Sequence, residues 1–364
     1  MNTKFKLASI ISIGLFVTGC GSSDESSNDT AKEGSETASY LTVTGINAVS
    51  DFAYFDLDTN QQLAITNEDA RTNTQWDIAF SGTSIILNSD QSGPGEVAAY
   101  FTGNNADFFD EEGAVIADKF INATSESEEE DFLSVTEYAS NTQFSTDYLE
   151  TVFGSSFYEY NSANHEISAN DTQYYLVSNA EGLYKVRVVS TSNLDGGVPG
   201  MTMTEFSLGY QFKGPDDQTF SSEETVQIAQ CDSQHYVDLS ENSEVTESNA
   251  WDLTVLCDQF EIQLGSNVKA FALAGDDTDE TVINDPDSNV KADSVNTVFK
   301  GQNKWYAYNL QGNHKIWSQY GVYLVKTPIA TYKLQVTGYY GLLDNEVSSR
   351  IYSFIYDTVT QAIE

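Results

Sequence analysis

The chain has 364 residues, 40% of them hydrophobic, which is enough apolar material for two domains of ordinary size. Its 16 Lys and Arg face 55 Asp and Glu, so the formal net charge is -39. Such a chain repels the phosphates of nucleic acids, and we therefore expect no nucleic-acid partner. The acidity is typical of a protein that stays soluble in a salty medium, and specific cation binding is the less favoured alternative.

The N-terminus has the pattern of a secretory signal. Lys4 and Lys6 precede an apolar stretch, residues 7–17, which is too short to span a bilayer as a permanent helix. The stretch ends in Val17-Thr18-Gly19-Cys20, which resembles a bacterial lipobox, in which the cysteine is lipidated and becomes the first residue of the mature protein. We therefore predict a cleaved lipoprotein signal peptide over residues 1–19 and lipidation of Cys20.

Position 21 is Gly rather than Asp, and this resemblance to Gram-negative lipoproteins predicts a lipid anchor in the outer membrane. The anchored protein would lie on the cell surface or on the periplasmic face. The segment after the cysteine, residues 20–39, is rich in Ser, Asp, Glu, Asn and Thr and has almost nothing apolar to bury. We predict that it is a flexible acidic tether.

Two further cysteines, Cys231 and Cys257, remain in a compartment where disulfides persist. Alternation places each of them on the apolar face of a predicted strand. We predict one disulfide that closes a loop of roughly 25 residues and contributes on the order of 3 kcal/mol. Two buried free thiols are the alternative.

The first predicted domain covers residues 40–214. Its strands are expected near 41–43, at 53–57 and around Trp76, where Trp76, Ile78 and Phe80 should share one face. A glycine-rich loop over 89–97 follows. Residues 104–131 are predicted to form a solvated loop, because a run of four carboxylates at 128–131 repels itself. A short helix is expected within 132–153, and strands are expected at 174–177, 183–189 and 206–212.

The second half repeats blocks of the first half in the same order, which predicts an internal duplication and a second domain over residues 222–358. Each block alone is an ordinary strand, but the ordered set indicates two related all-β domains. The paired blocks begin at Ala53 and His235, Trp76 and Trp251, Phe157 and Trp305, Asn164 and Asn313, Tyr175 and Tyr323, and Tyr184 and Tyr332.

The ordered blocks resemble the HmuY family of bacterial haem-binding outer-membrane lipoproteins. The resemblance is carried by Trp76-Asp77-Ile78-Ala79-Phe80, Ile85-Ile86-Leu87-Asn88, Ser92-Gly93-Pro94-Gly95, Tyr158-Glu159-Tyr160, His165-Glu166-Ile167, Tyr175-Leu176-Val177 and Gly182-Leu183-Tyr184-Lys185. The second copy keeps the late blocks but lacks the glycine-rich loop. The resemblance implies two tandem all-β domains, haem capture and delivery to an outer-membrane receptor.

Haem iron needs axial ligands, and the chain has only three histidines. His165 and His314 occupy equivalent places in the two copies, where the resemblance allows a ligand, so both are candidate haem ligands. The alternative is a structural role in a turn. A second ligand is not identified, because residues 81–160 and 258–304 contain neither His nor Met. His235 is expected to pack on a strand.

The sequence carries no nucleotide-binding loop, nucleophile elbow or zinc-protease motif, so we do not expect an enzyme. Met201 and Met203 are candidate thioether ligands, but a core or edge role is favoured. The acidic stretch at residues 276–280 has the oxygen density of a calcium loop without its order, and a solvated loop is favoured. The leading hypothesis is a lipoprotein that binds haem for uptake. The alternative is a structural or protein-interaction lipoprotein of the same fold that binds no haem.

Overall fold

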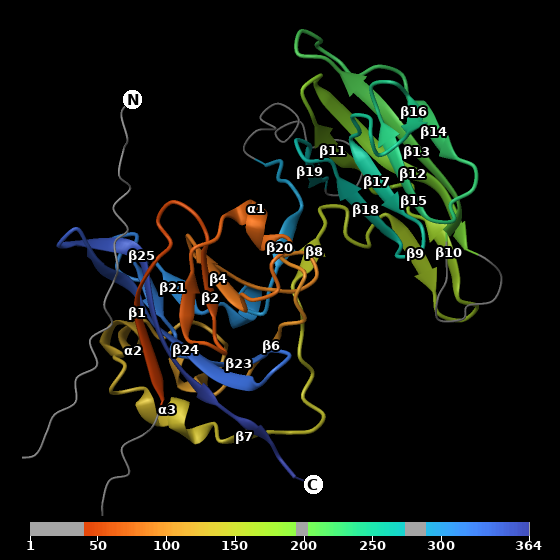
Figure 1. Cartoon of the computed structure of the whole chain (residues 1–364). Coiled ribbons are helices and arrows are strands. Elements are labelled where there is room, and N and C mark those ends of the chain that lie inside the picture. Colours follow the sequence, from red (N-terminus) through yellow and green to blue (C-terminus); the bar gives the residue numbers. More distant parts are fainter. Residues whose placement is uncertain (1–39, 194–202, 274–288, 364) are drawn as a thin grey trace, which may run out of the picture. The chain divides into compact units, whose positions relative to one another are not determined.

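The computed structural model describes residues 40–193, 203–273 and 289–363 (Figure 1). The predicted signal peptide, the predicted lipidation site Cys20, the predicted tether, Met201 and the acidic stretch at 276–280 lie outside the described residues. Strands account for 46% of the described residues and helices for 7%, which confirms the all-β fold. The strands form two lobes, each with its own five-stranded and four-stranded sheet.

The first lobe, which we call the terminal lobe, contains residues 40–147 and 297–363. Its larger sheet is antiparallel, in the order β1 (Leu41–Asn47), β25 (Glu346–Thr358), β24 (Thr331–Leu343), β23 (Val322–Lys326) and β6 (Ala98–Phe101). Its smaller sheet has the order β3 (Gln61–Leu63), β2 (Ala53–Asp56), β4 (Ile78–Ser81) and β5 (Ser84–Leu87). Side chains from both sheets form one core, in which the face predicted from Ala53, Phe55 and Leu57 is buried.

Shorter elements complete the terminal lobe. They are α1 (Asn67–Ala70), η1 (Ala106–Phe108), α2 (Ala117–Asn122), α3 (Glu129–Ser134), η3 (Gly301–Asn303), the hairpin of β21 (Tyr306–Tyr308) and β22 (Ile316–Ser318), and β7 (Glu137–Tyr138), which pairs in parallel with β26 (Thr360–Gln361).

The second lobe, which we call the inserted lobe, contains the described residues from 152 to 293, namely 152–193, 203–273 and 289–293. Its larger sheet has the order β14 (Glu224–Ile228), β13 (Met203–Lys213), β12 (Leu183–Asn193), β11 (Tyr175–Ser178) and β19 (Lys269–Ala272). Its smaller sheet has the order β16 (Ser243–Val245), β15 (Gln234–Asp238), β17 (Leu253–Leu256) and β18 (Glu261–Leu264), and β9 (Tyr158–Asn161) pairs with β10 (Glu166–Ala169). The chain passes between the lobes through β8 (Tyr148–Glu150) and β20 (Ser294–Asn296), which pair with each other.

The lobes do not coincide with the expected domains at 40–214 and 222–358, because strands of each lobe come from both. Strand β6 pairs with β23, and β11 pairs with β19, so each lobe combines strands from both of the expected domains. The colours of Figure 1 show the same exchange, because red and orange strands lie beside blue ones in the terminal lobe. The paired blocks in the sequence specify which strands are alike, but they do not specify which copy supplies a strand's partner.

Two local expectations also fail. Trp76 does not share a face with Ile78 and Phe80, because β4 begins only at Ile78. The indole instead packs with Tyr54 and Ala79 and donates a hydrogen bond to the carbonyl of Ala70 at 3.1 Å. Strict alternation of the strand therefore does not continue back to Trp76.

The acidic run at 128–131 is not a solvated loop but the start of helix α3. Carboxylates in the first helical turn are favoured by the helix dipole, and the helix buries Phe132. Glu128 is itself buried and forms an ion pair with Lys119, with 3.2 Å between their charged atoms. One cation therefore offsets part of the repulsion that predicted a loop.

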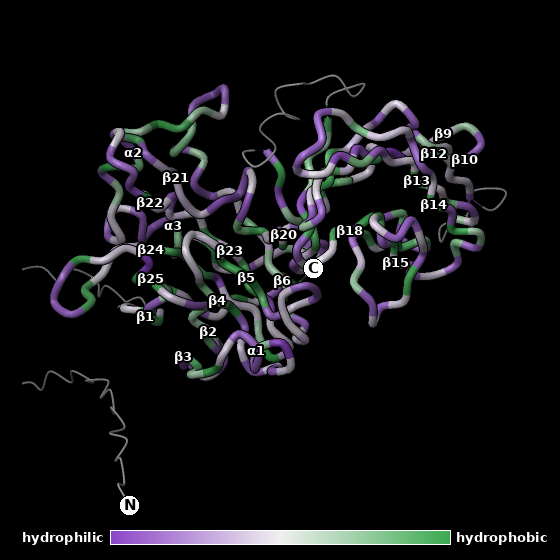
Figure 2. Tube along the Cα trace, turned by 90° about the horizontal axis from the view of Figure 1, so that it is seen from above, coloured by the Kyte–Doolittle hydropathy of each residue, from purple (hydrophilic) through white to green (hydrophobic). Residues whose placement is uncertain are grey.

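The predicted disulfide between Cys231 and Cys257 is present, with 5.4 Å between the Cα atoms. Both residues belong to the core of the inserted lobe, and Met203 is buried in the same core. Figure 2 shows the apolar positions along the strands of both lobes, whereas many connecting loops are hydrophilic. The disulfide thus reinforces a core that draws on strands from both expected domains.

The exchange of strands predicts how fragments of the chain behave. We expect residues 151–293 alone to fold cooperatively, because they contain all the strands of the inserted lobe. We expect residues 40–214 alone to lack a cooperative transition, because β1 and β6 lose their partners β25 and β23. Thermal unfolding followed by circular dichroism measures both. A cooperative monomeric transition in residues 40–214 would contradict the exchange.

Candidate functional site

His165 and His314 lie at the tips of two similar hairpins. His165 follows β9, and His314 follows β21 in the terminal lobe. Both residues have a left-handed backbone, with φ of 59° and 57°. In each hairpin the imidazole Nδ1 lies in hydrogen-bond contact with a tyrosine hydroxyl, that of Tyr160 for His165 and that of Tyr308, at 2.6 Å, for His314. The equivalence of the two histidines, inferred from the sequence, is matched by their local geometry.

Only His314 lines a described cavity with further aromatic and cationic side chains. The cavity measures about 420 Å³, and its walls include His314, Tyr308, Tyr339, Tyr340, Lys315 and Arg350. Tyr339 and Tyr340 come from β24, whereas Arg350 comes from β25. The β24–β25 hairpin and the β21–β22 hairpin therefore build this site together.

Several hydroxyl and charged groups of this cavity already form hydrogen bonds within the protein. The hydroxyl of Tyr340 accepts a hydrogen bond from the backbone N–H of Ile316 at 3.0 Å, which ties β24 to the residue after the turn. Burial raises the pKa of Tyr339, and its hydrogen bond with Arg350 acts in the opposite direction. The Arg350 guanidinium also donates to the carbonyl of Val49 at 3.1 Å. The cavity thus has a fixed aromatic wall with a cation at its edge.

The His165 hairpin lacks this wall. Aligning Tyr184 with Tyr332, as in the paired sequence blocks, places Thr191 and Ser192 where the terminal lobe has Tyr339 and Tyr340. The hydrogen bond that Tyr340 accepts from Ile316 has a counterpart in Asn193, whose side chain accepts from the N–H of Ile167 at 3.0 Å. The inserted lobe therefore keeps the turn but replaces the aromatic side chains by small polar ones.

The third histidine, His235, lies on β15 as expected but is not in the apolar cluster of that lobe. Its Nδ1 contacts a carboxylate oxygen of Glu244 at 2.7 Å, and its Nε2 lies 3.6 Å from Asp232. It is a strand histidine held between two acids, far in sequence from either hairpin tip.

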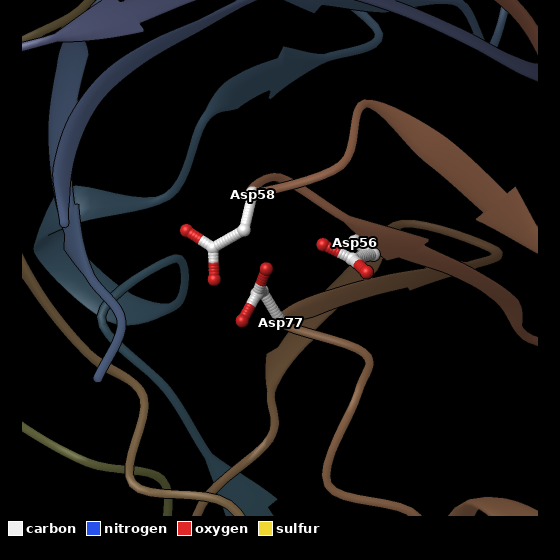
Figure 3. Close-up of side chains that lie close together, drawn as sticks. All are labelled: Asp56, Asp58 and Asp77. Carbon is white, nitrogen blue, oxygen red and sulfur yellow. The ribbon is translucent and has the colours of Figure 1, made fainter. Parts of the chain in front are cut away.

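Three carboxylates form the one group of metal-ligand type found in the described part of the chain. Asp56 and Asp58 lie at and just after the end of β2, and Asp77 immediately precedes β4 (Figure 3). Their nearest oxygens lie within 4.8 Å of one another. Asp77 accepts a hydrogen bond from the N–H of Leu57 at 2.7 Å, and Asp58 accepts from the hydroxyl of Tyr332 at 2.6 Å.

The inserted lobe contains the same hydrogen bond from a backbone N–H to an aspartate, but it has fewer aspartates around it. Asp252 accepts from the N–H of Leu239 at 2.9 Å, as Asp77 does from Leu57, but Ser240 stands where the terminal lobe has Asp58. A carboxylate recurs here because it satisfies a backbone N–H between two strands. The three aspartates therefore have a structural explanation and do not by themselves define a metal site.

The comparison with protein families identifies a family for part of the chain. Residues 48–206 match the family model described as HmuY protein. This segment belongs to the HmuY family. No curated protein matches the chain. The HmuY match covers a little under half of the chain, beginning in the terminal lobe and ending in the inserted lobe.

The HmuY segment contains His165, whereas His314 and its aromatic neighbours lie beyond it. Sequence reasoning found both histidines but missed Tyr339, Tyr340 and Arg350. The adjacent Tyr339-Tyr340 pair, which has no counterpart at Thr191-Ser192, was the available signal. In the described residues no helix is long and apolar enough to cross a membrane.

Two buried carboxyls in the terminal lobe make its stability depend on pH. Burial raises the pKa of Asp77 and of Asp147 to about 7, well above the ordinary value of 3.8. For Asp77 two neighbouring aspartates add to the rise, and for both residues hydrogen bonds oppose it. A raised folded-state pKa stabilises the fold fully below the unfolded-state pKa, and this contribution is lost as pH rises through the folded-state value.

We therefore expect the melting temperature of the terminal lobe to fall between pH 4 and pH 8. Asp77→Asn and Asp147→Asn should each flatten this dependence, since a neutral amide does not titrate. Differential scanning calorimetry across this range provides the measurement, and Glu346→Gln, an exposed charge removal, is the matched control. If both buried variants keep the slope of the parent protein, general charge repulsion rather than these two carboxyls causes it.

Proposed function

We propose that this protein is an outer-membrane lipoprotein that binds haem in the cavity beside His314. Membership of residues 48–206 in the HmuY family, known for haem binding, supports a haem-related role in general. The observation that carries the specific proposal is the His314 cavity, where an imidazole, three tyrosines, a lysine and an arginine converge.

The residue types of the cavity fit haem. The Nδ1 of His314 is engaged by Tyr308, so Nε2 is the nitrogen that would ligate iron, and a partner on Nδ1 is the usual way to orient such a ligand. Tyr339 and Tyr340 offer aromatic surface for the porphyrin. Lys315 and Arg350 are the counterions that its two propionates require.

A second histidine or a methionine does not line this cavity. The protein ligands it offers besides His314 are the phenol oxygens of tyrosines, and tyrosine is an established ligand of haem iron. Haem would thus be held by His314 alone or by His314 with a tyrosine. The proposed function includes transfer of the bound haem to an outer-membrane receptor.

The second candidate is a structural or protein-interaction lipoprotein of this fold that binds no haem. The observation in its favour is the close likeness of the two hairpins. Both histidines have the same φ and the same tyrosine contact, although only one lines an aromatic cavity. A shared role in the turn explains this likeness without any ligand.

Haem titration of a soluble form that starts after Cys20 separates the two candidates. We expect a Soret band to develop with one equivalent of haem, and His314→Ala to weaken binding at least tenfold and to shift that band. His165→Ala is the matched control, because it removes the same side chain from the same kind of turn, and it should change neither. A complete lack of a Soret shift in both redox states would favour the candidate without haem.

Anchoring is tested separately in cells. We expect the full-length chain to fractionate with the outer membrane and to incorporate labelled palmitate, because a lipid chain on Cys20 supplies membrane affinity. Cys20→Ser should abolish the label and release the protein from the outer membrane. Equal labelling of the variant and the parent chain would contradict lipidation at Cys20.

A further inference from the structure

The side-chain amide of Asn88 holds the glycine-rich loop against Trp76. The loop consists of Ser92, Gly93, Pro94 and Gly95. The fully buried Asn88 donates from Nδ2 to the carbonyl of Trp76 at 2.6 Å, and its Oδ1 accepts from the N–H of Gly95 at 2.9 Å. A Cβ atom on Gly93 would lie 2.6 Å from the indole and 2.2 Å from Asn88 Oδ1, so only glycine allows this approach.

A second buried side chain holds the start of the loop. Ser92 donates a hydrogen bond to Asp147 at 2.6 Å, and the same carboxyl oxygen accepts from the N–H of Leu87 at 2.8 Å. The other oxygen of Asp147 is buried without a hydrogen-bond partner among the described residues. Asn88 and Asp147, both buried, thus hold one surface loop in a defined position.

The loop forms one wall of the largest of the four cavities described, which measures about 670 Å³. Phe52, Tyr54, Ile86 and Pro94 give the cavity apolar surface. Arg71 and Lys300 contribute two cations, and Asp90 is the one acidic residue in the lining. The cavity therefore joins an apolar wall to an excess of positive charge.

This local charge is unusual in a chain with a net charge of -39. Within the described residues, neither Arg71 nor Lys300 forms an ion pair with a carboxylate. The Lys300 ammonium donates one hydrogen bond to the carbonyl of Val295 and has two further protons to offer. Lys300 also lowers the pKa of Asp147, against the larger rise caused by burial. Cations left without ion-pair partners beside apolar surface favour an anionic ligand.

The fold itself does not require these features, because the inserted lobe lacks them. Its sequence has no glycine-rich loop after Trp251, and the described structure has no helix between β16 and β17 to match α1, which precedes Arg71. Aligning Trp305 with Phe157 places Val152 opposite Lys300. The terminal lobe thus has the loop, helix α1 and Lys300, whereas the similar sheets of the inserted lobe form without them.

We propose that the cavity beneath the Ser92–Gly95 loop binds a small organic anion. Its apolar body would lie against Phe52 and Tyr54, and its carboxylate, sulfonate or phosphate would lie between Arg71 and Lys300. This site is separate from the proposed haem site, since the two cavities share no lining residue.

A matched pair of fluorescent probes tests the proposal on the soluble form of the full chain. 8-Anilino-1-naphthalenesulfonate carries the anion on an apolar body, and N-phenyl-1-naphthylamine is the same body without charge. We expect the sulfonate to bind, and Arg71→Gln and Lys300→Gln each to weaken it at least fivefold. The neutral probe should bind more weakly, and neither variant should change its affinity.

Three controls keep the outcome interpretable. Lys326→Gln removes a cation that lines none of the four cavities, and His314→Ala removes the proposed haem ligand, so both should leave sulfonate binding unchanged. Unchanged thermal unfolding shows that the Arg71 and Lys300 variants are folded. The proposal is overturned if the sulfonate binds folded Arg71→Gln and Lys300→Gln as tightly as the parent protein, or if the neutral probe binds equally well. Failure of haem to bind would not affect this result.

Discussion

Backbone pairing between the two ends of the chain is the constraint on which the terminal lobe depends. Strand β25 supplies hydrogen-bond partners for β1, and β23 supplies them for β6, across most of the length of the sequence. In the described residues β1 and β6 pair with no other strand, so the five-stranded sheet is incomplete until the last strands of the chain are present. The core of the terminal lobe depends on that pairing, because it joins side chains of the early and the late strands.

The same constraint explains why the inserted lobe is contiguous in sequence. Its strands follow each other directly in the middle of the sequence, so β12, β13 and β14 pair as neighbours along the chain. The disulfide between Cys231 and Cys257 adds a local closure to this lobe. The terminal lobe is closed instead by contacts of very long range, such as the hydrogen bond from Tyr356 to the carbonyl of Leu57.

The likeness of the two lobes makes the difference between the two histidine sites clear. The hairpin tips are alike, since Tyr160 with His165 repeats Tyr308 with His314. What differs is the neighbouring strand pair, where β24 contributes Tyr339 and Tyr340 and β12 contributes Thr191 and Ser192. The two lobes therefore share a scaffold, and the side chains that face the tip decide which lobe has a lined cavity.

The sequence by itself determined the all-β class, the likeness between strands of the two copies, the disulfide and the equivalence of the two histidines. These follow from local alternation and from residue types that repeat at matched spacing, such as Tyr175 with Tyr184 and Tyr323 with Tyr332. Only the tertiary structure decided which strands pair with each other, because similar strand edges can pair in more than one way at similar local energy. It also decided that Trp76 leaves the face of β4, that α3 forms within an acidic run, and that Arg350 and Arg71 reach cavities formed by residues far away in sequence. Such contacts depend on long-range packing, which no short window of sequence records.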